Sequence, residues 1–251
     1  MRKIAILNQN GGVVKTTSCL NIGAGLADHG KQVLLIDLDP QSHLTDGLGV
    51  LSEGEGGKTV YDLMKGLVKI EDVIIKRQAG LDILPSDIGL SAAESELAST
   101  VGRELKLRRA LNEIQGYDFV LVECPPSLGL LTVNALSFVD EIFITIQPEY
   151  FSLQGARRML DSIELVKQIF NKGLAVTGVV VTLSDTRKNV TDVETKVRSF
   201  FGEKTFKTVI RDNVSLAEAL GQGQSIFEYA PSSRVAKDYI SLVKEILEGR
   251  S

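Results

Sequence analysis

Short apolar runs alternate with longer amphipathic stretches along the chain. The short runs are nearly continuous in apolar residues, which is typical of parallel strands that helices cover on both faces. They predict strands at Ile4–Leu7, Val33–Ile36, Leu81–Leu84, Phe119–Val122, Ile142–Ile146 and Val176–Leu183. A further, shorter strand is expected to end at Val209–Ile210.

The stretches between these runs carry apolar residues at helical spacing. The first of them stops at Gly30, a residue type common at helix C-termini. Helices are predicted at Thr16–His29, Glu104–Ile114, Leu153–Phe170, Asp192–Phe201 and Ser232–Leu247. This repetition predicts the α/β class: a doubly wound, mostly parallel sheet with helices on both faces and right-handed crossovers.

The chain has 251 residues, with no Pro/Ser-rich linker and no internal repeat, so residues 1–251 are expected to form a single domain. Ser52–Lys58 is the one flexible-looking insert and is interpreted as a surface loop. The apolar run near the start is too short for a signal peptide, and no stretch approaches the length of a membrane span. A cytoplasmic protein is therefore predicted.

Composition excludes several classes of function. A hydrophobic content of 43% excludes a disordered chain. Two cysteines, Cys19 and Cys124, cannot make a disulfide framework, and with only two histidines no metal-cluster spacing is present. The net charge of −4 gives no global attraction to nucleic acid, so any DNA binding needs a local basic patch.

A glycine-rich turn follows the first predicted strand and opens the first predicted helix. It reads NQNGGVVKTT over residues 8–17. Backbone N–H groups converge at such a turn, and the positive end of the helix faces a bound anion. A lysine there reaches phosphate oxygens and a neighbouring threonine binds Mg²⁺, which are the positions of Lys15 and Thr16. The alternative for this loop alone is a glycine-rich turn without a ligand.

The loop resembles the deviant Walker A motif of the ParA/MinD family, K-G-G-V-G-K-T-T. Three further segments resemble that family in order and spacing. VLLIDLDPQ at 33–41 is similar to its second motif and first switch, and VLVECPPSLG at 120–129 to its Walker B strand and second switch. QPEYFSLQG at 147–155 is similar to a ParA/Soj segment. Nearly the whole chain is covered, and it resembles chromosomal ParA (Soj) more closely than MinD.

The resemblance implies a deviant-Walker P-loop fold, with ATP and Mg²⁺ as cofactors. It implies catalytic roles for Lys15, which holds the β- and γ-phosphates, and for Asp39, which orients the attacking water. For Asp37 and Asp39 the alternative is a pair of carboxylates at a strand end, solvated or capping the next turn. The residues implied for nucleotide are Gly11, Gly12, Val13, Lys15, Thr16, Thr17 and Asn213, and those for the metal are Thr16, Asp37 and Glu123.

Three residues depart from the family pattern. Asn10 replaces the signature lysine that reaches the partner's phosphates in a nucleotide sandwich dimer, a charge-assisted contact worth about 1.5–3 kcal/mol. Val14 replaces a glycine, and its β-branched side chain restricts the backbone beside the phosphates. Glu123 replaces the Walker B aspartate and pushes the carboxylate toward the Mg²⁺ shell, whose geometry is strict.

These departures lead to the hypothesis of a ParA-like partition or positioning protein for chromosome, plasmid or other cargo, with ATP binding and hydrolysis weakened or lost. One alternative is a non-enzymatic ParA-like interaction or regulatory module, which dimerises without nucleotide or pairs with a competent paralogue. The other is a still competent ATP-dependent, DNA-binding ATPase.

The partners implied are a ParB-like protein, non-specific DNA and a second copy of the chain in a homodimer. Arg187 matches a basic position of the family. The family segment P-R-N-V-R reads Arg211-Asp212-Asn213-Val214-Ser215 here, so both arginines of the pattern have moved or gone, and Arg211 compensates for their loss only in part. For the other basic clusters the alternative to DNA binding is a solvated helix face; they are Arg103, Lys106, Arg108 and Arg109, then Lys196 and Arg198, and then Lys204 and Lys207. Acidic residues interrupt the C-terminal stretch 242–251, which predicts a core-packing helix and no membrane anchor.

Overall fold

A computed structural model describes residues 1–8, 14–50, 57–147, 151–183 and 188–249. Within these residues an eight-stranded sheet runs in the order β3-β4-β2-β5-β1-β6-β7-β8. Every neighbouring pair is parallel except the β3–β4 hairpin at one edge. The strands are β1 Arg2–Asn8, β2 Val33–Asp37, β3 Ile75–Gln78, β4 Leu81–Leu84, β5 Phe119–Glu123, β6 Glu141–Ile146, β7 Ala175–Leu183 and β8 Thr205–Arg211.

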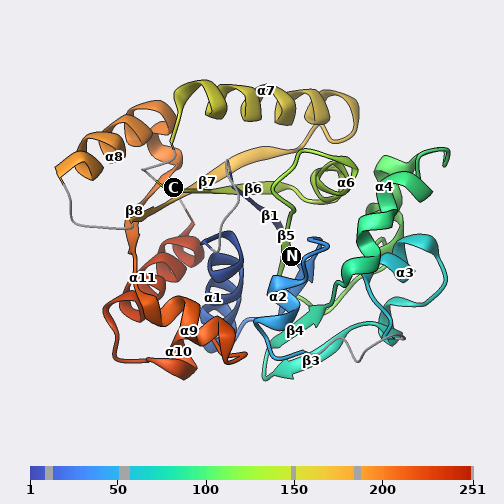
Figure 1. Ribbon diagram of the computed structural model, residues 1–251, viewed down its shortest axis with the longest axis horizontal. Coiled ribbons are helices and arrows are strands. Elements are labelled where there is room, and N and C mark those ends of the chain that lie inside the picture. The colour runs from blue at the N-terminus through green and yellow to red at the C-terminus, as the bar shows by residue number, and fades with distance from the viewer. Residues whose placement is uncertain (9–13, 51–56, 148–150, 184–187, 250–251) are drawn as a thin grey trace.

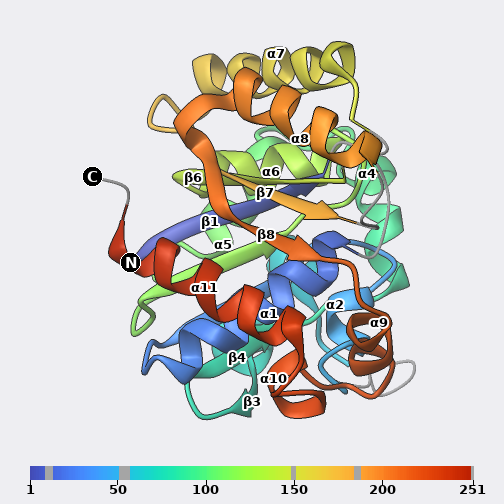
Figure 2. The same ribbon diagram turned by 90° about the vertical axis from the view of Figure 1, so that its left-hand side faces the viewer.

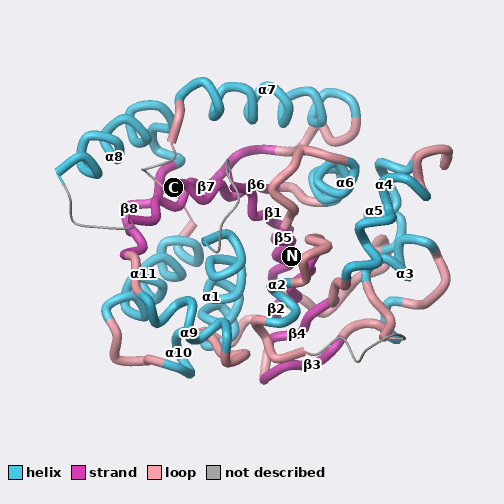
Figure 3. The backbone as a smooth tube through the Cα atoms, in the orientation of Figure 1, coloured by secondary structure: helices cyan, strands magenta, loops and turns pink. Residues whose placement is uncertain are grey.

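Helices cover both faces of this sheet, as Figures 1 and 3 show, so the predicted doubly wound fold is confirmed. One face carries α3 to α8, and the other carries α1, α2 and α9 to α11. Figure 2 shows α11 beside α1 on the second face. The helices are α1 Val14–Asp28, α2 His43–Asp46, α3 Val60–Lys65, α4 Ala93–Glu96, α5 Lys106–Ala110, α6 Leu130–Phe138, α7 Leu153–Ile169, α8 Lys188–Phe201, α9 Val214–Gly221, α10 Ile226–Tyr229 and α11 Arg234–Glu248.

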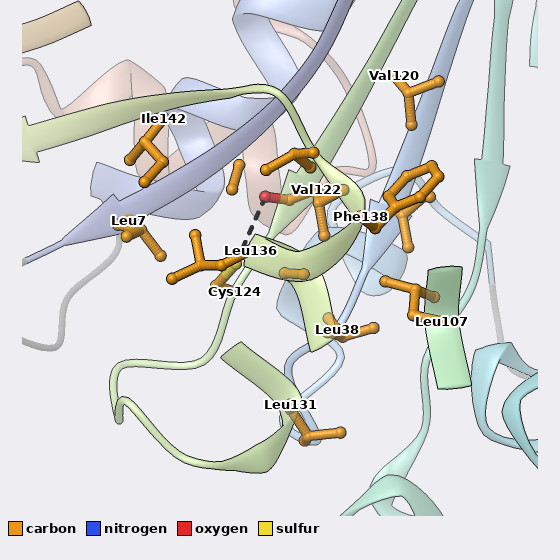
Figure 4. Close-up of a cluster of buried hydrophobic side chains, with 14 of the residues drawn as sticks. Leu7, Leu38, Leu107, Val120, Val122, Cys124, Leu131, Leu136, Phe138 and Ile142 are labelled. Atoms are coloured by element: carbon orange, nitrogen blue, oxygen red, sulfur yellow. Dashed lines mark hydrogen bonds between the residues drawn. The ribbon is translucent and has the colours of Figure 1, made fainter. Parts of the chain in front are cut away.

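The central strands are apolar on both sides because each side packs into its own core. In β1, Ala5 and Leu7 belong to the cluster under α3–α8, while Ile4 and Ile6 belong to the cluster around α1 and α11. Figure 4 shows part of the first cluster, in which Leu7 of β1, Val122 of β5 and Leu136 of α6 lie together. Two cores explain why the strand sequences are continuous runs of apolar residues rather than alternating ones.

The predicted helix ends are shifted by a few residues at most places, and Gly30 does follow the first helix, with φ of +75°. The continuous helix predicted at Glu104–Ile114 is wrong. A 3₁₀ turn at Arg103–Leu105 precedes the short α5 instead. The buried Asn134 amide accepts from the Leu107 N–H at 3.0 Å and donates to the Arg103 carbonyl at 2.9 Å. In a continuous helix the Leu107 N–H would donate to the Arg103 carbonyl, but here both groups are hydrogen-bonded to the Asn134 side chain instead.

Several elements have no counterpart in the sequence-based prediction: α6, the edge strand β3, and the short helices α2, α3, α4, α9 and α10. The strand expected to end at Val209–Ile210 is longer and extends over Thr205–Arg211. Most of the predicted surface loop Ser52–Lys58 lies outside the described residues. Among the helices of the described part, none has the length and apolarity that crossing a membrane requires.

Candidate nucleotide site

The candidate site lies where the central strands β1, β2 and β5 end. Asp37 at the end of β2 is in register with Glu123 at the end of β5, and Glu123 is in register with Ile6 of β1. Helix α1 begins at Val14, so its first turn carries Lys15 and Thr16 over the same edge. The parallel topology therefore brings these predicted residues together. Asn10, Gly11, Gly12 and Val13 lie outside the described residues.

Lys15 is buried among acceptors, with 5% of its surface exposed. Its Nζ lies 3.3 Å from Asp39 Oδ2 and 3.7 Å from Glu123 Oε1, and it also donates to the carbonyl of Cys124. The ammonium is therefore the counter-ion of this carboxylate cluster. A lysine held in this way has to leave these partners before it can bind a phosphate.

Glu123 reaches from β5 to the first turn of α1. Thr16 Oγ1 donates to Glu123 Oε1 at 2.5 Å, while Oε2 is buried without a hydrogen-bond partner among the described residues. The pKa of Glu123 is raised to about 8, chiefly by burial and also by the charge of Asp37, while Lys15 opposes the rise. An unpartnered buried carboxylate oxygen is costly unless a cation or a proton satisfies it.

Asp37 is tied to α2. Its Oδ2 accepts from the Thr45 hydroxyl at 2.8 Å and the Thr45 N–H at 2.9 Å, and its Oδ1 accepts from the Asp39 N–H at 3.0 Å. Burial raises the pKa of Asp37 to about 6, against the lowering effect of these hydrogen bonds. Asp39 Oδ1 accepts from the Gln41 N–H at 3.0 Å. Both carboxylates thus cap the chain that follows β2, which is the structural alternative considered for them.

A cavity of about 550 Å³ opens beside Lys15, Thr16 and Asp39. One wall is α2 and the opposite wall is α9. Thr17 is buried next to Thr16 in α1. Asn213 does not line this cavity. It is the N-cap of α9, and its Oδ1 accepts from the Ser215 N–H at 2.9 Å. The wall residues are His43, Asp46 and Gly47 on one side and Ala217, Leu220 and Gly221 on the other.

Of the two arginines predicted for DNA, only Arg211 belongs to the described residues. Arg211 ends β8 and forms a two-pronged ion pair with Asp238 of α11, at 2.9 Å from Nε and 2.5 Å from Nη2. This pairing raises the pKa of Arg211. Arg187 lies outside the described residues.

The donor set fits a magnesium nucleotide. Hydroxyl and carboxylate oxygens are the ligands Mg²⁺ prefers, and it commonly takes one or two carboxylates together with phosphates and waters. The unpartnered Glu123 Oε2 is an oxygen that a cation would satisfy. Within the described residues, no three His, Cys, Asp or Glu side chains are grouped to hold a metal by themselves, so phosphate and water would complete its shell.

Other residues of the site were not anticipated. Ser86 donates its hydroxyl to the Asp39 carbonyl at 2.9 Å, and its N–H donates to Thr45 Oγ1 at 3.0 Å. Ser42 has φ of +50°, the left-handed region, immediately before α2. Ser86 follows the neighbouring strand β4, so its place at this edge could have been deduced from topology. No local sequence pattern indicated that Thr45 and Ser42 belong to the site.

Comparison with known proteins gives matches over most or all of the chain. A family model described as an AAA domain matches residues 1–176. The sporulation initiation inhibitor protein Soj of Bacillus subtilis is 44% identical over 246 residues, which are 97% of each chain. The chromosome partitioning protein ParA of Caulobacter vibrioides is 39% identical over 252 residues, covering 98% of this chain and 94% of the relative.

Solved structures with the same fold include a ligand-bound relative. The cobyrinic acid a,c-diamide synthase of Mycobacterium smegmatis, with bound ATP analogue and magnesium, superposes with a TM-score of 0.86 at 34% identity, over 99% of this chain and 94% of that chain. The cell division ATPase MinD of Pyrococcus furiosus superposes with a TM-score of 0.77 at 25% identity, over 98% of both chains.

Proposed function

The chain is a member of the ParA/Soj family of P-loop ATPases, and from this premise we propose that it is a partition or positioning protein whose site grips Mg·ATP weakly. The cargo is a chromosome, a plasmid or another large body. The relatives named for chromosome partitioning support the first part of this proposal. The geometry around Lys15 supports the second.

The main observation in support of weak nucleotide binding is the position of the Glu123 carboxylate. It contacts the Thr16 hydroxyl at 2.5 Å and lies 3.7 Å from the Lys15 ammonium. A Mg²⁺ ion that binds Thr16 Oγ1 has to fit beside the Glu123 carboxylate, which is already hydrogen-bonded to the same hydroxyl. Lys15 must also give up Asp39, Glu123 and the Cys124 carbonyl to reach a phosphate. Both changes oppose binding.

When Mg·ATP is bound, the metal ion would neutralise the negative charge of the phosphates during phosphoryl transfer. Lys15 and the first turn of α1 would hold the phosphates, together with Gly11, Gly12, Val13 and Thr17. Thr16, Asp37 and Glu123 would hold the ion. Asp39 would orient water, and Asn213 would stand at the adenine end as the cap of α9.

The test is isothermal titration of the chain with Mg·ATP, followed by a steady-state ATPase assay. We expect weak or undetectable binding and little turnover. Micromolar affinity with turnover that stops in Asp39→Ala would contradict the weak site and establish a competent ATPase. The triple variant Asn10→Lys, Val14→Gly and Glu123→Asp is expected to gain affinity and activity.

The non-enzymatic interaction or regulatory module remains a second candidate, favoured by the burial of Lys15 among carboxylates. The triple variant distinguishes it. A gain of ATPase activity indicates decay from an ATPase, whereas no gain in a folded triple variant indicates a scaffold that has diverged further. Size-exclusion chromatography without nucleotide then tests for a nucleotide-independent homodimer.

For partners we propose a ParB-like protein and non-specific DNA. Because Arg211 is held by Asp238, we do not expect it to carry the DNA contact. A gel-shift assay at low and high salt measures DNA binding, since phosphate contacts weaken steeply with salt. Absence of retardation at low salt would remove DNA from the proposal. A large loss of retardation in Arg211→Ala would show that the ion pair opens on binding.

A further inference from the structure

The two walls of the nucleotide cavity meet at their outer end with unusually close backbone contact. Gly49 follows α2 and Gly223 follows α9, with φ of +64° and +68°. A Cβ added to Gly223 would lie 2.8 Å from Gly49 Cα and 2.9 Å from Gly49 N. A Cβ added to Gly47 would lie 2.1 Å from Leu220 Cδ1. At Gly223 a side chain would collide with the backbone of Gly49, so backbone lies against backbone there, whereas at Gly47 the Leu220 side chain fills the space between the walls.

One arginine from a third element joins both walls. Arg77 lies in the edge strand β3, and its Nε donates to the Leu48 carbonyl at 2.5 Å. Its Nη2 donates to the Gly223 carbonyl at 2.9 Å. A guanidinium is planar and holds its N–H groups in a fixed fork, so it fixes the distance between the carbonyls that it bridges. Figure 1 shows β3 and β4 at the same end of the molecule as α2.

Both walls continue inward to the candidate chemistry. On the α2 side, Thr45 is bonded to Asp37 through its hydroxyl and its N–H. On the α9 side, the chain continues into α10, where the Ile226 N–H donates to Asn21 Oδ1 at 2.7 Å. Asn21 in turn donates to the Thr17 carbonyl in the first turns of α1, at 2.8 Å. A displacement of either wall is therefore transmitted to groups beside the phosphate-binding turn.

We propose that Arg77 is a positioning residue that clamps α2 to the α9–α10 turn and so fixes the width of the nucleotide cavity. Arg77 is not among the residues that line the cavity, and it acts through the Leu48 and Gly223 carbonyls. This inference rests on the proposed function in one respect only, namely that the ligand of the cavity is an adenine nucleotide. The clamp itself is a property of the ligand-free chain.

The experiment compares wild type with Arg77→Met, which keeps a long side chain without donors, and Arg77→Lys, which can bond only one carbonyl well. Hydrogen–deuterium exchange is measured on the ligand-free proteins. In Arg77→Met we expect exchange to rise about tenfold in the segments 43–50 and 214–226 together, as loss of a charge-assisted hydrogen bond implies. Arg77→Lys should show a smaller rise in the same two segments.

The second readout is the dissociation constant of a fluorescent ADP analogue, which we expect to weaken about fivefold in Arg77→Met. Arg198→Met is the matched control. Arg198 likewise donates to two backbone carbonyls, those of Phe206 and Lys207, but away from the cavity. Its variant should lose overall stability without a change of exchange in 43–50 or 214–226 and without a change in nucleotide affinity.

Unchanged exchange in Arg77→Met, or a rise confined to one wall, would overturn the clamp. If Arg77→Met does not fold, the same criterion is applied to Arg77→Lys. If the wild-type chain binds the ADP analogue too weakly to measure, as the weak site proposed above predicts, the exchange in the two walls alone decides whether Arg77 joins them. Faster exchange in both walls with unchanged nucleotide affinity would overturn the positioning role.

Discussion

The hydroxyl of Thr16 donates to the carboxylate of Glu123 at 2.5 Å, joining the first turn of α1 directly to the end of β5. With its other oxygen buried and unpartnered, Glu123 stands where a cation could bind but brings its carboxylate one methylene closer than an aspartate would. The contact therefore joins two of the residues implied for the metal, one of which, Glu123, departs from the family pattern.

Shortening this side chain is expected to improve metal-dependent binding. In Glu123→Asp the carboxylate withdraws from Thr16 and leaves room for an ion with its waters, so Mg·ATP should bind about tenfold more tightly, or ~1.4 kcal/mol. Titration calorimetry with and without Mg²⁺ measures the change. Glu123→Gln, which keeps the length and removes the charge, should show no such gain. Equal affinities of Glu123→Asp and wild type would contradict the explanation.

Removing the ammonium of Lys15 should destabilise the ligand-free protein. Lys15→Ala leaves Asp39 and Glu123 buried without their counter-ion, and breaking a buried ion pair in this way costs roughly 3–5 kcal/mol. Urea unfolding followed by circular dichroism measures the loss.

The matched control for Lys15 is Lys65→Ala, which removes the 3.0 Å ion pair with Glu96 at the surface. An exposed pair contributes about 1 kcal/mol or less, so this variant should differ little from wild type. If both lysine variants lose the same stability, Lys15 is not the counter-ion of a buried cluster.

The meeting of Asp37 and Glu123 was predictable because both end parallel strands, and parallel strands present their carboxyl ends at one edge of the sheet. The contacts that surround these two carboxylates were not predictable from the sequence. Thr45 reaches Asp37 from a helix of four residues, too short for any periodic signal, and Arg77 bonds a carbonyl 146 residues away. Such contacts depend on how loops pack, which local spacing does not encode.

The interruption of the helix predicted at Glu104–Ile114 also results from a contact between segments that are distant in the sequence. Leucines at helical spacing within Glu104–Ile114 predict one helix, and Leu107, Leu111 and Ile114 are indeed buried. The side-chain amide of Asn134, from a helix that the prediction lacked, replaces a backbone hydrogen bond there. A buried amide from a distant segment overrides local propensity, because leaving it unsatisfied would cost more than breaking the helix.

Relieving the backbone at Ser42 should stabilise the protein. Ser42 has φ of +50° and its side chain makes no capping hydrogen bond to α2. The left-handed region costs a non-glycine residue about 1–2 kcal/mol, and glycine avoids this at an entropic cost of about 0.5–1 kcal/mol. Ser42→Gly should therefore raise the free energy of unfolding by up to about 1 kcal/mol, measured by urea unfolding.

Gly30→Ala is the reverse control for Ser42→Gly. Gly30 has φ of +75° with no atom within 4 Å of an added Cβ, so the variant tests backbone strain without a clash. It should lower the free energy of unfolding by about 1 kcal/mol. A stabilised Gly30→Ala, or a destabilised Ser42→Gly, would show that left-handed strain does not decide either position.

Cys124 should make stability depend on pH in the alkaline range. Burial raises the pKa of its thiol to about 12 from the ordinary value of 9.0, with the charges of Glu123 and Asp39 adding to the rise and Lys15 opposing it. The folded chain then keeps a proton that the unfolded chain loses, so the stability that this thiol contributes falls as pH rises from about 9 towards 12. Cys124→Ala should flatten this slope, measured by urea unfolding across the alkaline range.

The same burial should protect both thiols from a disulfide reagent. Cys19 is also fully buried, and burial, with the charges of Glu123 and Asp37, raises its pKa. Because a thiolate is the reacting species, neither cysteine should react in the folded chain at neutral pH, and both should react once urea unfolds it. Rapid labelling of native protein would contradict the buried position of Cys124 behind Lys15. Labelling at the rate of global unfolding would agree with it, because the thiols are then exposed only in the unfolded chain.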